Sequence, residues 1–181
     1  MGEIIISKEL TDACIRKLPD AQEAVYKLVY SEFMKICLRY TGDYDEAANV
    51  LQEAFIKIFM RSEAYSGKGS FVGWMKRIVV NSAIDQIRKR SKLVEVPIDE
   101  QEWSVSEDIP EHEYIVDQPL LLKTIRELPE MQLLVFNLFV MDNCSHQEIA
   151  VKLSISVASS KWHLFEARRI LKNKLSVYIN D

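Results

Sequence analysis

Cysteine and glycine are scarce in this sequence. The three cysteines, Cys14, Cys37 and Cys144, are odd in number and widely spaced, without a Cys-x-x-Cys pair or a cysteine–histidine quartet. This pattern indicates neither a disulfide framework nor a zinc site, and Cys144 with His146 lacks two further nearby ligands. The five glycines form no phosphate-binding loop, and no Glu-x-x-His pair or nucleophile constellation stands out. We therefore expect no metal, no cofactor and no enzymatic activity.

Long hydrophobic runs and targeting signals are missing as well. The longest apolar run, residues 131–141, is interrupted by Gln132 and Asn137, and a membrane-spanning helix needs about 20 apolar residues. The first ten residues lack the basic region and the long apolar core of a signal peptide. The sequence therefore predicts a cytoplasmic protein that is not inserted in a membrane.

Charge is strongly segregated along the chain, although the net charge is only −4. Residues 66–92 carry seven bases and the single acid Asp85, a net charge of +6. Residues 161–174 carry five bases and the single acid Glu166, a net charge of +4. Between these blocks, residues 93–120 hold nine acids and no Lys or Arg. This asymmetry weighs more than the acidic mean, and it favours contact with a nucleic acid.

Helical periodicity dominates the sequence and predicts an all-α fold. Helices are expected at about 8–18, 20–41, 43–63 and 70–91, with a second helical unit that begins near residue 119. We predict three parts: a helical domain over 1–92, an acidic and flexible linker over 93–118, and a helix-turn-helix domain over 119–181. The linker is expected because acids dominate and prolines interrupt the periodicity there.

The segment 69–92 predicts a helix with two different faces. At about 100° per residue, one face carries Trp74, Arg77, Asn81, Asp85 and Arg88, and the other carries Met75, Val79, Val80, Ala83 and Ile87. Basic side chains neutralise phosphates, Asn reads base edges and a Trp ring stacks on a base. The first face therefore suits a nucleic-acid backbone with unstacked bases, although a surface helix with snorkelling arginines fits the same residues.

Residues 145–169 predict a helix-turn-helix. Ser145 with Glu148 forms a capping box, and Ser154 occupies the turn, where a left-handed conformation carries a modest cost. Ser156 is the expected N-cap of the second helix.

The second helix is expected to bury Val157, Leu164, Ala167, Leu171 and Leu175. It is expected to expose Trp162, Phe165, Glu166 and Arg169, flanked by Lys161, His163 and Arg168. This pattern is typical of a recognition helix in the major groove, and an ordinary helical hairpin is the alternative.

The order of these blocks resembles a bacterial sigma factor of the extracytoplasmic-function (ECF) type, a two-domain member of the sigma-70 family. The first half matches through residues 26–59 and 69–90, and the second through residues 128–156 and the helix that follows. The resemblance implies that core RNA polymerase and promoter DNA are partners, and that an anti-sigma factor holds the protein inactive. It also implies that the acidic linker threads the polymerase, where its carboxylates mimic RNA phosphates, although a simple spacer explains the acids equally well.

The resemblance assigns roles to individual residues. The polar contacts with the β′ clamp of the polymerase would be Asp45, Glu46, Asn49, Gln52, Glu53 and Lys57, with Leu51, Phe55, Ile56 and Phe59 mostly in the core, and the β flap would be a further contact. The loop at about 60–69 and the next helix would open the −10 element and hold a flipped base, with contacts from Trp74, Lys76, Arg77, Asn81, Arg88 and Lys89. The −35 element would be read by Ser156, Ser159, Lys161, Trp162, His163, Phe165, Glu166, Arg168 and Arg169.

One alternative class remains open at this stage. A one-component transcriptional regulator would use residues 1–92 as a ligand-binding or dimerisation domain and would bind duplex DNA without polymerase. Its hallmark is an apolar pocket or a strong dimer seam in the first half, and the sequence shows neither. Co-purification with core polymerase separates the two classes.

Overall fold

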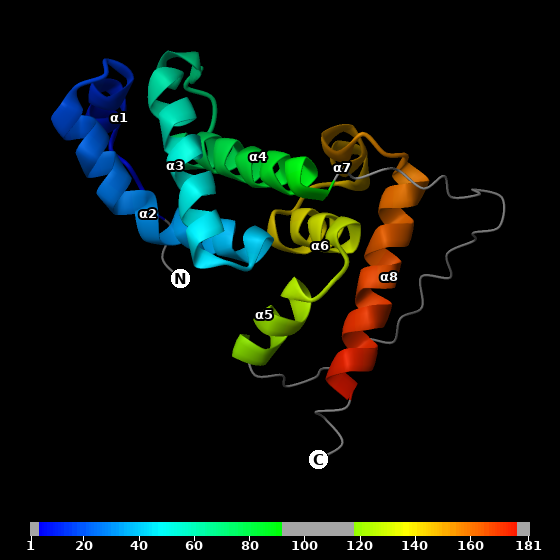
Figure 1. The fold of residues 1–181 in the computed structure, drawn as a ribbon. Coiled ribbons are helices and arrows are strands. Elements are labelled where there is room, and N and C mark those ends of the chain that lie inside the picture. The colour runs from blue at the N-terminus through cyan, green and yellow to red at the C-terminus, as the bar shows by residue number, and fades with distance from the viewer. Residues whose placement is uncertain (1–3, 92–117, 177–181) are drawn as a thin grey trace. The chain divides into compact units, whose positions relative to one another are not determined.

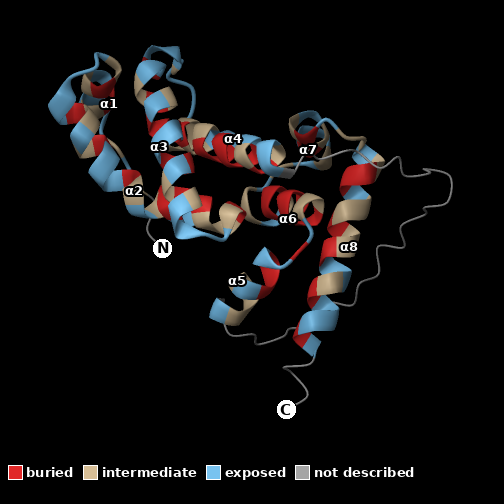
Figure 2. Cartoon of the chain, in the orientation of Figure 1, coloured by how far each residue is buried: buried red, intermediate tan, exposed pale blue. Residues whose placement is uncertain are grey.

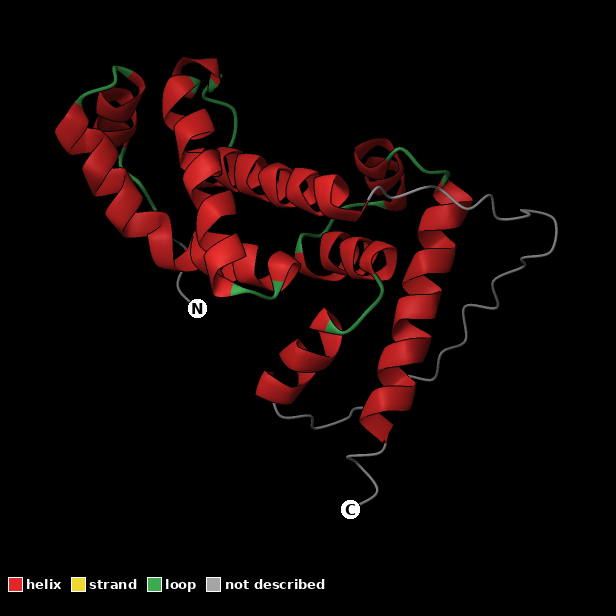
Figure 3. Ribbon diagram, viewed as in Figure 1, coloured by secondary structure: helices red, strands yellow, loops and turns green. Residues whose placement is uncertain are grey.

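The computed structural model describes residues 4–91 and 118–176, and every regular element in these ranges is a helix (Figure 1, Figure 3). The predicted all-α fold is therefore confirmed for the described part of the chain. The chain divides into two compact units, Met1–Ser91 and Lys92–Asp181. The segment predicted as an acidic linker lies outside the described residues, apart from Gln118, which begins a helix.

The described residues of the N-terminal unit form four α-helices and one short 3₁₀ turn. They are α1 (Lys8–Ile15), α2 (Pro19–Thr41), α3 (Tyr44–Met60), η1 (Ser62–Ala64) and α4 (Phe71–Ser91). The first helix ends three residues earlier than predicted, because Lys17 adopts a positive φ of 61° and Pro19 starts the next helix. The third helix also ends three residues early, because the chain tightens into η1.

The junction between α2 and α3 forms as its sequence predicts. Gly42 ends α2 with a φ of 76°, and its N–H donates to the carbonyl oxygen of Leu38 at 3.0 Å. The Asp43 carboxylate accepts from the N–H of Glu46 at 2.9 Å and caps α3. This two-residue junction sends α3 back against α2.

The core of the N-terminal unit lies among α2, α3 and α4, which all pack on one another. Phe33 and Tyr40 of α2 and Leu51 and Ile58 of α3 are nearly inaccessible to solvent. The stripe predicted for the inner face of α4 is buried as expected: Met75, Val79, Val80, Ala83 and Ile87. Figure 2 shows these buried positions along the helices, with exposed positions on the opposite sides. The polar face of α4 therefore points away from the core.

The C-terminal unit is built around its longest helix. Its elements are α5 (Gln118–Arg126), α6 (Glu130–Phe136), the π-helical segment η2 (Asn137–Met141), α7 (His146–Leu153) and α8 (Val157–Ser176). Helix α8 packs against α5, α6 and α7. The core includes Leu134, Leu138, Ile149, Leu164 and Ala167. The longest apolar run of the sequence is thus a largely buried helical segment of this unit.

The helix-turn-helix is formed by α7 and α8. The capping box is confirmed: the Ser145 hydroxyl accepts from the N–H of Glu148, whose carboxylate accepts from the N–H of Ser145 at 2.8 Å. Ser154 is left-handed (φ 57°, ψ 44°), and the Ser156 hydroxyl accepts from the N–H of Ser159 at 2.9 Å. One burial prediction is wrong: Val157 is 39% exposed, because it is the first residue of α8 and precedes the part that meets the core.

Candidate polymerase and nucleic-acid interfaces

The outer face of α3 combines polar and apolar side chains. Four of the six polar residues predicted there are exposed, namely Asp45, Asn49, Gln52 and Glu53. Ile56 and Met60 continue the same face, with 53% and 69% of their surface exposed. The prediction that Ile56 lies mostly in the core is wrong, because it follows Gln52 by four residues and shares its outward direction. Leu51 and Phe55 are buried as predicted, and Phe59 is half-buried.

The other two polar residues predicted on α3 are half-buried and turn toward α4. Glu46 Oε2 lies 3.1 Å from Nη1 of Arg90. Lys57 Nζ donates to the hydroxyl of Ser82 at 3.0 Å and lies 4.0 Å from Oδ2 of Asp85. Glu46 and Lys57 therefore link α3 to α4 within the N-terminal unit, which leaves the exposed residues as the outward polar set.

The polar face of α4 is accessible along its length. Arg77, Asn81 and Lys89 are exposed, whereas Trp74, Lys76 and Arg88 are half-buried. The acid on this face, Asp85, lies near Lys57 of α3. The face therefore presents a majority of cationic and amide groups to a ligand, which is the composition that binds phosphates and base edges.

An aromatic cluster of Tyr65, Phe71 and Trp74 stands where α4 begins. The Phe71 and Trp74 rings are stacked at 5.5 Å and 8°, and the Tyr65 ring lies 5.0 Å from Phe71 and 5.9 Å from Trp74. The Tyr65 hydroxyl donates to the carbonyl oxygen of Gly69 at 2.6 Å, and the Ser70 hydroxyl accepts from the N–H of Gly73 at 2.9 Å. These bonds fix the loop that carries the cluster. No pattern in the sequence indicated that Tyr65 belongs to it.

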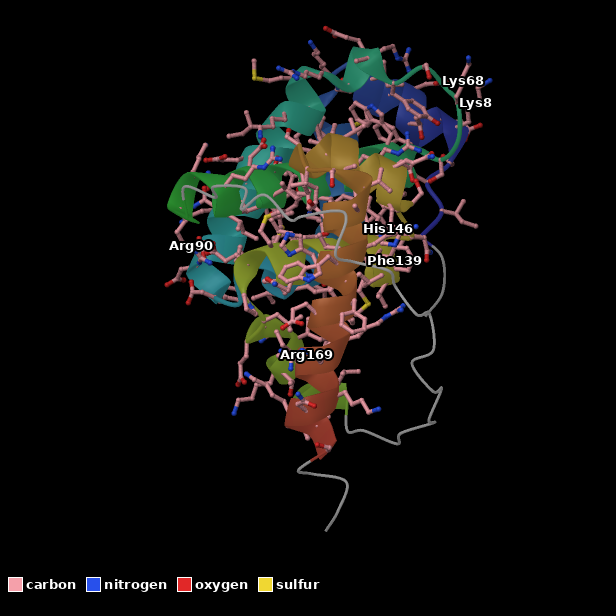
Figure 4. The ribbon with its side chains drawn as sticks, turned by 90° about the vertical axis from the view of Figure 1, so that its right-hand side faces the viewer. Lys8, Lys68, Arg90, Phe139, His146 and Arg169 are labelled. Atoms are coloured by element: carbon pink, nitrogen blue, oxygen red, sulfur yellow. The ribbon has the colours of Figure 1, made fainter. Side chains whose placement is uncertain are left out.

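A cavity of about 430 Å³ lies beside this cluster, between the loop and the N-terminal segment. Its lining comes from residues 4–6 and 8 on one side and from Tyr65, Gly67 and Gly69 on the other. Both glycines have positive φ, 75° and 77°, and a Cβ at either would meet no atom within 4 Å. Backbone conformation, and not lack of space, therefore favours glycine at these positions. Figure 4 labels two lysines near this end of the unit, Lys8 and Lys68.

Helix α8 presents a cationic surface. Lys161, Arg168 and Arg169 are exposed. Five other residues predicted to contact the −35 element are half-buried: Ser156, Trp162, His163, Phe165 and Glu166. The last predicted contact, Ser159, is buried and only 4% exposed. The Ser156 hydroxyl donates to the Ser159 hydroxyl at 3.0 Å, so Ser159 lies inside the N-terminal turn of α8 instead of on its outer face.

A second cluster joins η2, α7 and α8. The His146 ring stacks on Phe139 at 4.6 Å and 26°, and its Nδ1 lies 2.9 Å from the hydroxyl of Ser160 (Figure 4). The guanidinium of Arg168 lies 5.9 Å from the Phe139 ring centroid. Burial lowers the pKa of His146, and the charges of Lys161 and Arg168 lower that pKa further. The neutral ring thus holds the first turn of α7 against α8.

The described residues hold no group of three or more His, Cys, Asp or Glu side chains arranged to bind a metal ion. None of the described helices is both long and apolar enough to cross a membrane.

Two helical units that each expose basic side chains on one helix are typical of a protein that binds DNA through two modules. The family model described as Sigma-70 region 2 matches residues 25–93, and the model described as Sigma-70, region 4 matches residues 119–171. The chain therefore belongs to the sigma-70 family, and within it to the ECF sigma factors: it binds core RNA polymerase and directs transcription from promoters. Members of this family are transcription initiation factors and not enzymes. The matches to both regions favour a sigma factor over the alternative of a one-component regulator.

Relatives and solved structures agree over nearly the whole chain. The ECF RNA polymerase sigma-E factor of Haemophilus influenzae is 25% identical over 94% of this chain and 98% of the relative, and that of Escherichia coli is 24% identical over 96% and 99%. The sigma factor RpoE of Bartonella quintana, solved with the anti-sigma factor NepR, has a TM-score of 0.56 at 19% identity and covers 86% of this chain and 96% of its own. CnrH, solved with the cytosolic domain of CnrY, has a TM-score of 0.55 at 17% identity over 93% and 96%. These two structures support the fold.

Proposed function

We propose that the outer face of α3 is the main contact with core polymerase, on the β′ clamp. The supporting observation is the exposure of Ile56 and Met60 beside the polar residues of the same face. Large apolar side chains inside a polar rim are typical of protein–protein interfaces. The cationic residue Lys57 and the acidic residue Glu46 contribute indirectly, because they hold α3 on α4.

This assignment is tested by measuring the affinity of the full chain for core polymerase. The double variant Gln52→Ala, Glu53→Arg should bind about tenfold or more weakly, which is the loss expected when central interface residues are changed. Glu23→Arg is the matched control, because Glu23 is an exposed acid on α2. Equal affinity of the double variant and the control would contradict the assignment.

The proposed role of the loop before α4 and of α4 itself is to open the −10 element. The aromatic cluster offers a ring surface on which an unstacked base can stack. The cavity lined by the same loop offers space beside that surface. Arg77, Asn81, Lys89 and, with less exposure, Lys76 and Arg88 supply groups for the backbone and base edges of the separated strand. Stacking of an extruded base offsets part of the cost of unpairing it, which is about a few kcal/mol.

The proposed role of α8 is to read the −35 element as duplex DNA. Lys161, Trp162, His163, Phe165, Arg168 and Arg169 present at least part of their surface on this helix, and Ser156 caps it. A holoenzyme selection from a randomised −35 library tests this role. Arg169→Ala should change the preferred bases, whereas Lys172→Ala should weaken binding to all sequences by a similar factor and lower the salt slope by about one. A wild-type holoenzyme without any −35 preference would contradict the proposal.

We further infer a cytoplasmic location, a contact between the C-terminal unit and the β flap, and control by an anti-sigma factor. The support for control by an anti-sigma factor is that the two solved structures described above are complexes, and the complex from Bartonella quintana contains the anti-sigma factor NepR. An anti-sigma factor that covers the α3 face should compete with core polymerase. A tagged chain recovered from uninduced cells should therefore carry a stoichiometric partner and little polymerase, and recovery with polymerase alone would refute this control.

A further inference from the structure

The recognition helix carries an ion pair on its own surface. Glu166 and Arg169 are three residues apart on α8, which places them on neighbouring positions of one face. Arg169 Nε donates to Glu166 Oε2 at 2.8 Å, and Arg169 Nη2 donates to Glu166 Oε1 at 2.6 Å. The two residues therefore act as a unit, although each was predicted to contact bases by itself.

The two partners are not equally accessible. The side chain of Arg169 is 54% exposed and that of Glu166 only 19%. The hydrogen bonds from Arg169 lower the pKa of Glu166, and the hydrogen bonds to Glu166 raise the pKa of Arg169, so both groups stay charged. The carboxylate is thus the inner, supporting member of the pair, and the guanidinium is the outer member.

The bidentate contact also decides which edge of the guanidinium remains for a ligand. It uses the N–H of Nε and one N–H of Nη2, which form one side of the planar group. One N–H of Nη1 and the second N–H of Nη2 form another edge with two parallel donors. Two parallel donors match the O6 and N7 acceptors of guanine in the major groove.

We propose that Glu166 is a positioning residue: it holds Arg169 so that the outer edge of the guanidinium reads one guanine of the −35 element, and it does not read a base itself. This inference rests on the proposed reading of the −35 element by α8. An arginine side chain loses considerable rotamer freedom when it is immobilised. Orienting it before DNA binds reduces that loss and fixes the geometry that discriminates between bases.

The test is a selection from a randomised −35 library by holoenzyme that contains the full chain with Arg169→Ala, Glu166→Ala, Glu166→Gln or both alanine changes. Glu127→Ala is the matched control, since it also removes a paired acid of the same unit, whose carboxylate lies 2.8 Å from Lys174. The measured quantity is the preference for the best base over the others at each position. Affinity alone is unsuitable, because removal of any carboxylate near phosphates strengthens binding to every sequence.

The expected result is that Arg169→Ala and Glu166→Ala reduce the preference at the same position, each by about tenfold, and that the double variant loses no more than either single variant. Glu166→Gln should keep part of the preference, because its amide oxygen still accepts from Arg169. Glu127→Ala should keep all of it.

Three results would overturn the inference and leave −35 recognition intact. The first is that Glu166→Ala changes the preference at a different position, since Glu166 then reads its own base. The second is that Glu166→Ala leaves the preference at the Arg169 position unchanged or sharpens it, since Arg169 then reads its base without help from the carboxylate. The third is that Arg169→Ala preserves the wild-type motif. Absence of any motif in the wild type would instead refute the proposed function of α8, and this inference with it.

Discussion

Replacement of Trp74 by alanine should impair DNA melting by a predictable amount. The Trp74 ring is stacked on Phe71 at 5.5 Å, and the residue is half-buried, so part of its surface is accessible to a base. Stacking of a base on an aromatic side chain contributes about 1–3 kcal/mol, which corresponds to roughly a 5- to 150-fold change in an equilibrium constant. Loss of the ring contacts with Phe71 and Tyr65 costs about 0.5–1.5 kcal/mol each. That loss is below the stability of a typical domain, about 5–15 kcal/mol, so the variant should fold.

The assay is permanganate footprinting of open complexes formed by the variant holoenzyme. On linear promoter DNA, Trp74→Ala should lower the open-complex yield by about 30-fold, which corresponds to about 2 kcal/mol, the middle of the stacking range. A template with a premelted −10 bubble should restore the yield in part, because unpairing is no longer required. Trp74→Phe should lie between the variant and the wild type, since it retains a ring.

The matched control is Trp162→Ala, which removes the half-buried Trp of α8. Its effect should be the same on linear and premelted templates, because duplex recognition does not depend on the state of the −10 element. Normal melting by Trp74→Ala, or a defect that the bubble leaves unchanged, would refute the stacking argument.

Three further predictions concern the stability and chemistry of the described residues. Ser154→Gly should raise the free energy of unfolding of the C-terminal unit, measured in urea, by about 0.5–1 kcal/mol. The left-handed conformation of Ser154 costs about 1–2 kcal/mol, which glycine avoids, but the greater entropy of glycine in the unfolded chain cancels part of this gain. The pKa of His146 is lowered in the folded state, so the unfolded chain binds a proton first as the pH falls. The stabilisation contributed by neutral His146 is therefore complete above about pH 6.5 and is lost as the pH falls toward the folded-state pKa. In urea titrations at about pH 7.5 and about pH 5.5, the unfolding free energy of His146→Asn should change less between the two pH values than that of the wild type. Burial raises the pKa of Cys37 to about 12 and also raises the pKa of the buried Cys14, so a thiol reagent followed by mass spectrometry should label the half-buried Cys144 first in the native protein.

Features that depend on neighbouring residues in the sequence were predictable here. The cap of α7 by Ser145 and the left-handed Ser154 are set by local hydrogen bonding, and the buried stripe of α4 follows from its period. The Glu166–Arg169 ion pair was also predictable from the sequence, because an acid and a base three residues apart lie side by side on a helix. Each side chain was instead predicted to make its own contact with a base.

Two errors at the start of α8 have a common physical origin. Periodicity shows which direction a side chain takes, but it does not show which turn of the helix reaches a partner. Val157 and Ser159 lie in the first turn of α8, where the first is exposed and the second is enclosed by its own cap. The contacts of Tyr65 with Trp74 and of His146 with Phe139 join residues that pack only after the chain folds. No local signal encodes such pairs.

The central claim is that this chain gives core RNA polymerase the ability to start transcription at particular promoters. The most direct measurement is run-off transcription in vitro with purified core polymerase on genomic fragments, with and without the chain. We predict discrete transcripts with defined start sites that require the chain and that decrease when the double variant Gln52→Ala, Glu53→Arg replaces it at a concentration below saturation. Transcripts identical to those of core polymerase alone would contradict the account.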